Sequence, residues 1–281
     1  MARHIVCLTF DFDALSLWLA RGMTTPTPIS RGEFGVVGAE RILALLARRG
    51  IAATWFIPGH TLETYPEVCA RVHAAGHEIG QHGYTHQPPA TLSRAEEDAA
   101  LGRCNEIITR LTGAPAHGYR SPSWDLSPHT VELLLKHGFL YDSSLMGDDY
   151  LPYRCRQEDV LPLDQPAQFG RATSLIEMPI SWSLDDYPHF EYVRMPTFIQ
   201  PGLQRTENVL ANWLDEFRYM RQSVDWGVLT YTFHPQVSGR GHRMLMLERL
   251  IEGLAEMGAV FTTLEAAAAE FAQRAPFAAP A

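Results

Sequence analysis

The chain has 281 residues, 46% of them hydrophobic and 20% charged, which is enough apolar material to bury the core of one large α/β domain. Its formal net charge is -9, with 32 acidic against 23 basic residues, and it carries no lysine- or arginine-rich run that could contact phosphates. We therefore expect no nucleic acid partner. No apolar run is long enough to cross a bilayer, so we expect no membrane partner either.

The cysteines and the first residues bear on the cellular compartment. Cys7, Cys69, Cys104 and Cys155 form no C-x-x-C pair, which favours reduced, structural thiols. The first residues, MARHIVCLTFDFDA, lack the long apolar stretch and the small-residue cleavage site of a secretory signal. These features predict a cytoplasmic protein.

Strand-like and helix-like segments alternate along the whole chain. The predicted strands cover 4–10, 52–57, 77–82, 116–121, 139–144, 172–181, 227–234 and 259–264. The predicted helices cover 39–50, 66–76, 92–113, 127–138, 203–222 and 242–257, with a last alanine-rich helix behind them. This alternation, without an internal linker, predicts an α/β fold in a single domain, 1–281. About seven β-then-α units imply a parallel sheet wrapped by helices. Closed into a barrel, this sheet would place the carboxyl ends of its strands on one face.

Three long stretches, 14–37, 145–171 and 182–201, have no predicted secondary structure and are rich in aromatic residues. Loops of this length are usually functional or disordered. We interpret them as walls of a substrate pocket, with surface decoration or a subunit contact as the alternative. The predicted pocket residues are Trp18, Trp124, Trp182 and Tyr187.

The first predicted strand ends in Asp11-Phe12-Asp13. Side chains alternate along a strand, so both carboxylates face the same way and repel each other unless a cation or a proton lies between them. The alternative is that the two aspartates lie at a solvated strand end and have no function.

The third predicted strand ends in His82-Gly83-Tyr84-Thr85-His86. Gly83 and the prolines that follow argue against a long helix and favour a turn, and irregular backbone of this kind often holds ligands. Two histidines and one carboxylate are a recurrent ligand set for Zn²⁺ or a similar divalent metal, with positions left open for water and substrate. Neutral surface histidines are the alternative.

Two further strand ends carry functional candidates. Arg120 precedes a proline turn and could hold an aspartate ionised through a bidentate contact, although the segment could also be an ordinary approach to a helix. His234, followed by Pro235, is well placed as a proton donor, although a lone histidine is more often structural.

Together these strand ends resemble the polysaccharide deacetylases, also called the NodB-homology or carbohydrate esterase family 4. The resemblance spans roughly residues 5–265 and rests on four motifs: Thr9-Phe10-Asp11-Phe12-Asp13, His82 to His86, Arg120-Ser121-Pro122, and a last motif ending in His234. It implies a distorted (β/α)7-type barrel of the NodB-homology type. It also implies a metal-dependent hydrolase of carbon–nitrogen bonds other than peptide bonds.

The resemblance also implies a role for each matched residue. Asp13, His82 and His86 would bind a divalent metal, Zn²⁺ in the first place, with Co²⁺, Ni²⁺ and Mn²⁺ as alternatives. Asp11 would be the general base, and Arg120 would orient it and keep it ionised. The backbone N–H near Ser123 would help to stabilise the oxyanion, and His234 would protonate the leaving nitrogen. The motif whose aspartate tunes the catalytic histidine is unclear, with Asp185 and Asp186 as candidates.

The sequence departs from the usual family pattern at two positions. Asp-Phe-Asp replaces adjacent aspartates, and Gly83 stands where many members have serine or threonine. The first departure, with the long aromatic loops, resembles a cytoplasmic branch of peptidoglycan-deacetylase-like proteins, allantoinase-type enzymes and cyclic imide hydrolases. That branch forms homotetramers, so a homo-oligomer is expected here.

Three functions are compatible with the sequence. The first is hydrolysis of a small amide, either a cyclic imide or ureide or a short N-acyl sugar. The second is deacetylation of a polysaccharide such as peptidoglycan, against which the missing secretory signal counts. The third, a catalytically silent binding protein, is disfavoured because Asp11 and His234 are both present.

Overall fold

A nine-stranded sheet forms the centre of the computed structural model, which describes residues 2–195 and 199–277. Its strands are β1 (Arg3–Asp11), β2 (Thr54–Ile57), β3 (Glu78–Gln81), β4 (Gly118–Tyr119), β5 (Tyr141–Asp142), β6 (Tyr153–Gln157), β7 (Arg171–Glu177), β10 (Trp226–Phe233) and β11 (Val260–Phe261). They follow the order β10-β1-β2-β3-β4-β5-β7-β6, and β11 pairs with β1. All pairs are parallel except β6 with β7. A separate two-stranded sheet joins β8 (Val193–Arg194) to β9 (Ile199–Gln200).

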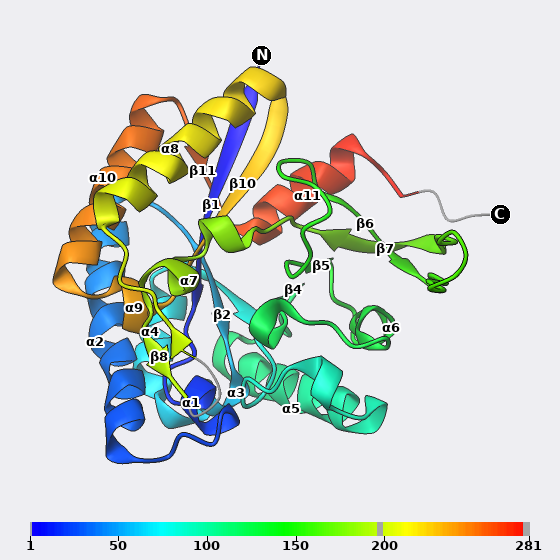
Figure 1. The fold of residues 1–281 in the computed structure, drawn as a ribbon, viewed down its shortest axis with the longest axis horizontal. Helices are drawn as coiled ribbons and strands as arrows, with labels where there is room; N and C mark the ends of the chain where they lie inside the picture. The colour runs from blue at the N-terminus through cyan, green and yellow to red at the C-terminus, as the bar shows by residue number, and fades with distance from the viewer. Residues whose placement is uncertain (1, 196–198, 278–281) are drawn as a thin grey trace.

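The sheet curls into an incomplete barrel (Figure 1). Its two ends approach each other where the chain that follows β7 reaches β10. There, Asp185 and Thr232 form a single parallel bridge. We call this contact the seam of the barrel. The expected α/β barrel is confirmed, and the seam is where its distortion lies.

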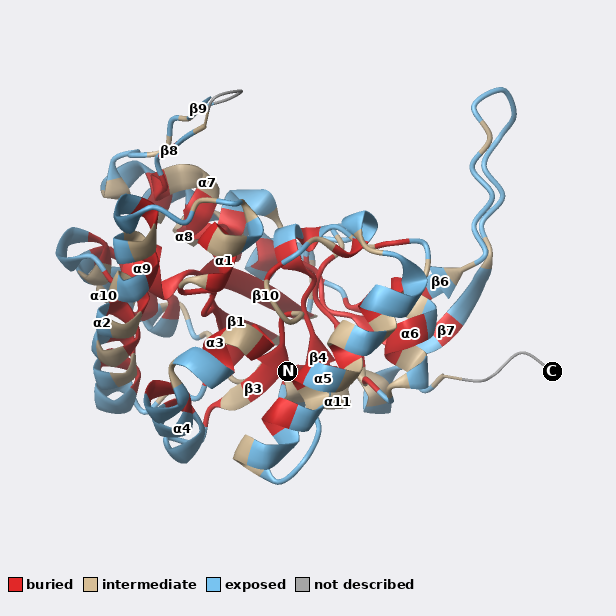
Figure 2. Cartoon of the chain, turned by 90° about the horizontal axis from the view of Figure 1, so that it is seen from below, coloured by how far each residue is buried: buried red, intermediate tan, exposed pale blue. Residues whose placement is uncertain are grey.

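Helices cover the outside of the curled sheet, and Figure 2 shows their buried faces turned toward it. They are α1 (Ser16–Ala20), α2 (Pro26–Arg49), α3 (Gly59–Thr64), α4 (Pro66–Ala74), α5 (Arg94–Thr112), α6 (Thr130–Lys136), α7 (Asp186–Phe190), α8 (Thr206–Ser223), α9 (Pro235–Ser238), α10 (Gly241–Glu256) and α11 (Leu264–Arg274). Short 3₁₀ turns occur at Pro89–Thr91, Pro122–Trp124 and Trp182–Leu184. The capping box expected at the start of α5 is present, with Ser93 and Glu96 each bonding to the other's backbone N–H.

The core explains why the central strands are continuously apolar. Every residue of β1 after Arg3 is buried, because helices cover the outside of the sheet and the barrel interior is filled by side chains. Phe10 stacks on Trp55 of β2 and on Phe233 of β10, with ring centroids 4.8 and 5.4 Å apart. Neighbouring strands are therefore locked together just before the ends that carry the polar residues.

The three stretches predicted to lack secondary structure contain several elements. The stretch 14–37 holds α1 and the first part of α2, which begins at Pro26 instead of residue 39. The stretch 145–171 holds β6, which pairs with β7 as an antiparallel hairpin, and 182–201 holds α7, β8 and β9. In α2 the buried face carries glycines and small residues, so the apolar periodicity that would predict a helix is missing there.

The hairpin of β6 and β7 projects from the body, at the upper right of Figure 2. Its outer part carries the exposed apolar residues Val160, Leu161, Leu163 and Phe169. Across the part of the chain that the structure describes, no helix has the length and apolar composition needed to span a membrane.

Helix α2 passes close to α9, which begins directly after His234. A Cβ atom added at Gly38 would lie 1.9 Å from the carbonyl oxygen of Pro235, a backbone atom that cannot turn away. Gly102, inside α5, is different: an added Cβ would meet only His137, at an ordinary distance of 3.6 Å.

We predict opposite effects of alanine at these two helical glycines. Gly38→Ala should lower Tm by about 5 °C or more, because overpacking against backbone costs roughly 1–3 kcal/mol or more. Gly102→Ala should raise Tm by about 1–4 °C, because it removes backbone freedom from the unfolded chain without a clash. Thermal unfolding followed by circular dichroism measures both variants. A Tm for Gly38→Ala at or above the wild-type value would contradict the close approach of α2 to α9.

Candidate metal and acid–base site

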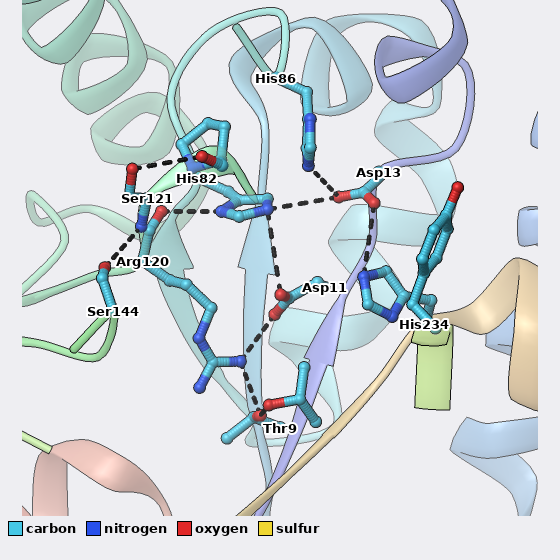
Figure 3. Close-up of polar contacts among 12 residues, drawn as sticks. Thr9, Asp11, Asp13, His82, His86, Arg120, Ser121, Ser144 and His234 are labelled. Carbon is cyan, nitrogen blue, oxygen red and sulfur yellow. Dashed lines mark hydrogen bonds and ion pairs between the residues drawn. The ribbon is translucent and has the colours of Figure 1, made fainter. Parts of the chain in front are cut away.

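The polar residues expected at the strand ends converge at one end of the barrel, as Figure 3 shows. Asp11 is the last residue of β1, and Asp13 follows two positions later. His82, Arg120 and His234 each come directly after a strand, β3, β4 and β10 respectively. Because these strands are parallel, their carboxyl ends face the same side, and the structure brings all of the predicted catalytic and metal-binding side chains together there.

Asp13, His82 and His86 form a compact buried cluster. One ligand atom from each lies within 4.8 Å of the others. Asp13 Oδ1 is 3.5 Å from His82 Nε2 and 3.7 Å from His86 Nε2. The segment from His82 to His86 is a turn, as expected, and Gly83 and His86 both have left-handed backbone, with φ of 66° and 57°. This conformation directs both imidazoles at Asp13.

The cluster fits a divalent cation by three independent observations. His82 Nδ1 lies 2.7 Å from the carbonyl oxygen of Arg120, an acceptor, so the ring proton is on Nδ1 and the lone pair of Nε2 faces Asp13. Among residues 2–195 and 199–277, the buried atoms Asp13 Oδ1 and Asp11 Oδ2 have no hydrogen-bond partner. Burial, with His82 and Arg21 adding to it, lowers the pKa of His86 well below its usual value, so His86 is neutral, as a ligand must be.

A bound cation would stabilise the buried carboxylate of Asp13. Burial raises the pKa of Asp13 to about 6, although His234 and His82 act in the opposite direction. A buried carboxylate with an unpartnered oxygen is unfavourable without a positive charge next to it. One carboxylate oxygen and two imidazole nitrogens are a common ligand set for Zn²⁺, Co²⁺, Ni²⁺ or Mn²⁺.

Asp11 is held by a buried ion pair instead of lying in the ligand cluster. Arg120 Nη1 is 2.8 Å from Asp11 Oδ1 and also donates to the hydroxyl of Thr9 at 2.8 Å. Burial raises the pKa of Asp11, but Arg120, His82 and His234 together outweigh burial and lower it below its usual value. Asp11 is therefore ionised at neutral pH, with Oδ2 directed toward His82 Nε2 at 3.9 Å.

A second layer of side chains, which no sequence pattern predicts, positions Arg120. The Arg120 guanidinium donates to the carbonyl oxygen and the hydroxyl of Ser143, at 3.0 and 2.9 Å. Ser144 accepts the backbone N–H of Ser121 at 2.8 Å and donates to Asp142. Glu177 accepts the backbone N–H groups of Ser144 and Leu145, each at 2.9 Å. The loop after β5 is thus fixed by carboxylates of β5 and β7.

His234 contacts two aspartates at the seam, Asp185 and Asp186. Its Nδ1 is 2.8 Å from Asp186 Oδ1 and 3.4 Å from Asp185 Oδ1. Asp186 also accepts the backbone N–H of His234 and the hydroxyl of Ser238, so its orientation is fixed. Burial lowers the pKa of His234, but Asp185 and then Asp186 raise it, to about 10 overall. Both candidates for the aspartate that tunes the catalytic histidine therefore contact His234, and Asp186 is the closer of the two.

Ser123 lies in a strained turn at the edge of the cavity. Ser123 and Trp124 have consecutive left-handed backbone conformations, with φ of 59° and 54°, which are costly for residues other than glycine. In the described part of the chain the backbone N–H of Ser123 donates to no oxygen. It is available to an oxygen atom bound in the cavity.

These residues line a cavity of about 310 Å³. Its lining comprises Asp11, Asp13, Leu17, Arg21, His82, His86, Ser123, Trp124, Trp182, Asp185, Tyr187, Pro188, Gln200 and His234. Trp124 and Trp182 stack face to face at 4.1 Å, and the Tyr187 ring lies 5.2 Å from the His234 ring.

Three of the four predicted pocket residues line this cavity, and Trp18 does not. Trp18 is fully buried in the core beneath Arg31, whose guanidinium lies 4.6 Å from the ring, while the preceding Leu17 reaches the cavity. Successive residues of α1 point in different directions, so Leu17 and not the predicted Trp18 faces the cavity. The sequence interpretation also missed Arg21 and Gln200, which carry no recognisable pattern.

We predict about one bound equivalent of divalent metal in the purified protein. His82→Ala should reduce the metal content to a small fraction of this, because the N₂O ligand set loses one imidazole. His73→Ala, at an exposed position of α4, should leave it unchanged. Elemental analysis after gel filtration gives the ratios. Equal metal content in the two variants would refute the ligand assignment.

The contact between His234 and Asp186 predicts a change in titration. In metal-free protein, Asp186→Asn should lower the pKa of His234 from about 10 toward 6.5, because one of the two carboxylates that raise it is lost. The raised pKa also stabilises the fold, fully below pH about 6.5 and progressively less as pH rises through about 10. The variant should therefore lose stability chiefly at neutral and acid pH. Imidazole NMR titration gives the pKa, and an unchanged value would contradict the contact.

Known proteins provide an independent comparison. A family model described as polysaccharide deacetylase matches residues 2–141. The peptidoglycan deacetylase of Helicobacter pylori is 37% identical over 98% of this chain and 99% of its own length. The peptidoglycan deacetylase-like protein FGM2 of Gibberella zeae is 31% identical, over 95% of this chain and 86% of its own length.

Solved structures agree with this fold. One from Mycobacterium smegmatis, assigned as a polysaccharide deacetylase, has a TM-score of 0.84 and 29% identity, covering 100% of this chain and 95% of that chain. The structure of Puue allantoinase has a TM-score of 0.81 with 22% identity, covering 99% of this chain and 93% of that chain, which shows a shared fold alone. By sequence, by fold and by the residues at its strand ends, this chain belongs to the polysaccharide deacetylase family.

Proposed function

We propose that this protein is a metal-dependent amide hydrolase that removes the acyl group from an N-acylated amino sugar. One observation carries the proposal. A cation-binding cluster lies between an ionised, unpartnered carboxylate oxygen of Asp11 and the imidazole of His234, which is 3.7 Å from Asp13. A base and an acid therefore flank the same site in one cavity, as amide hydrolysis requires.

Asp11 is suited to take a proton from water. Arg120 keeps Asp11 ionised through Oδ1 and leaves Oδ2 facing the cavity. A divalent cation held by Asp13, His82 and His86 would supply Lewis-acid chemistry, polarising the amide carbonyl and making water more acidic. Asp11 can accept the proton because it is ionised at neutral pH and its Oδ2 has no hydrogen-bond partner among the described residues.

Ser123 and His234 are suited to the other two tasks. The free backbone N–H of Ser123 can donate to the oxygen that gains negative charge when the carbonyl is attacked. His234 carries a proton at neutral pH, because Asp185 and Asp186 raise its pKa, and it can give this proton to the departing amine nitrogen. Protonation is needed because an amide anion is a very poor leaving group.

The size of the cavity limits the substrate. A volume of about 310 Å³ holds one sugar-sized group, and it is at the small end for ligand pockets. The stacked Trp124 and Trp182 offer an apolar face on one side, which suits a sugar ring. The 37% sequence identity to a protein named peptidoglycan deacetylase, over 98% of this chain, supports an N-acyl sugar as substrate.

A small cyclic amide or imide is the second candidate. It is favoured by the same tryptophan pair, because a flat heterocycle of that size would fit beside the rings and within the cavity. Hydrolysis assays with N-acetylglucosamine oligomers, succinimide, hydantoin, dihydrouracil and allantoin separate the two candidates. Turnover of the imides alone would overturn the sugar assignment.

We predict that Asp11→Asn separates metal binding from turnover. The variant should keep its metal, because Asp11 lies outside the ligand cluster, and lose at least about 100-fold in kcat, since general base catalysis contributes 10²–10⁴-fold. Asp125→Asn provides the matched control, since Asp125 is exposed in the loop after Ser123. Elemental analysis and release of acetate measure the two properties. A variant with near-normal kcat would remove the proposed base, and an Asp125→Asn defect of similar size would point to general damage.

A further inference from the structure

Arg21 is a cation in the wall of the catalytic cavity that the proposed chemistry does not use. It ends α1 and lies against Tyr187, with Nη1 2.6 Å from the phenolic oxygen and the guanidinium carbon 5.4 Å from the ring centroid. Both residues line the cavity.

The guanidinium of Arg21 has donors to spare. Within residues 2–195 and 199–277 it has no carboxylate partner at ion-pair distance, and the phenolic oxygen of Tyr187 is its one hydrogen-bond acceptor. A guanidinium has five N–H donors, so most of them are unused. Arg120, the other arginine at this site, is different: it bonds to Asp11, Thr9 and Ser143.

Tyr187 adds a second unused donor at the same place. The residue is only 8% exposed, and its hydroxyl oxygen accepts the bond from Arg21. Its own proton has no acceptor in the described part of the chain. Burial, although opposed by Arg21, raises the pKa of Tyr187, so the phenol remains protonated. Because Tyr187 lines the cavity, an acceptor group of a bound ligand can reach this proton.

We infer that Arg21 and Tyr187 form a carboxylate-binding subsite, and that the substrate is an amide that carries a carboxylate. The inference rests on the proposed amide hydrolysis, whose substrate class it makes more specific. A planar guanidinium and an adjacent hydroxyl match the two oxygens of a carboxylate. A single arginine in a cavity that is also lined by Asp11 and Asp13 favours a monoanion over a doubly charged phosphate.

The position of the subsite indicates which part of the substrate carries the charge. The Tyr187 ring contacts the ring of His234, which donates a proton to the leaving amine, and its hydroxyl contacts Arg21. Tyr187 therefore spans the distance between the amine side of the scissile bond and the guanidinium. The carboxylate belongs to the amine half of the substrate and not to the acyl half. N-acetylmuramic acid has this arrangement, whereas N-acetylglucosamine and the neutral cyclic imides lack the carboxylate.

A matched pair of substrates tests the subsite. We predict that the wild-type protein prefers N-acetylmuramic acid to its methyl ester. Arg21→Met should lose about tenfold to a hundredfold in kcat/KM on the acid, chiefly through KM, because a hydrogen bond to a charged group is lost. The ester should change less than about threefold, since it has no charge to pair. Tyr187→Phe should show the same selectivity with a smaller loss, and Arg21→Lys should recover part of it.

An exposed arginine outside the cavity provides the control. Arg205→Met removes an exposed arginine outside the cavity, which pairs with Glu207, and should leave both substrates unaffected. Equal losses on the acid and the ester in Arg21→Met would show a general role in the fold. No preference for the acid in the wild-type protein would overturn the subsite.

A binding measurement separates this inference from the proposed function. In the metal-loaded Asp11→Asn protein, calorimetry should show that N-acetylmuramic acid binds more tightly than its methyl ester. Adding Arg21→Met should abolish that difference. Tighter binding of the acid without turnover of any amide by the wild-type protein would support the subsite and refute the hydrolase. Equal binding of acid and ester would refute the subsite, even if both were hydrolysed.

Discussion

The buried ion pair between Arg120 and Asp11 is the constraint on which the site depends. Both side chains are inaccessible to solvent, and the Arg120 guanidinium also lies 4.3 Å from the ring of Phe56. Loss of one partner would leave an uncompensated buried charge, which costs about 3–5 kcal/mol. The same arginine accepts a hydrogen bond from His82 through its backbone carbonyl. One residue therefore positions the proposed base and one proposed metal ligand, and it links β1 to β4.

The parts of the site that could be predicted from sequence are those set by strand ends. Asp13, His82 and Arg120 are each within two residues of a buried parallel strand, so topology alone brings them together. The choice between Asp185 and Asp186 could not be made, because it depends on how the chain after β7 meets β10. Nor could the subsite of Arg21, because an arginine without a patterned neighbour is usually a surface residue.

The sequence predicts the elements whose buried side chains recur as an apolar pattern. It does not predict those whose buried face is formed by glycines packed against backbone. The central strands and the later helices follow apolar patterns, and the expected barrel is present. The first part of α2 escaped because its inward face carries Gly32, Gly35 and Gly38, which pack against backbone instead of presenting apolar side chains. Trp18 shows the opposite case. It was expected to line the pocket as a loop residue, but it is buried in the core. The homo-oligomeric assembly stays a prediction.

The seam between Asp185 and Thr232 separates the residues proposed to bind the cation from those that set the pKa of His234. The proposed cation ligands and base lie at or after the ends of β1 and β3, which pair with β2 between them, so they would stay assembled if the seam stood open. The carboxylates that tune His234 reach it only across that single bridge. Cation capture and proton delivery are thus structurally separable. Under the proposed function, a molecule damaged at the seam would still bind metal but would not protonate the leaving amine.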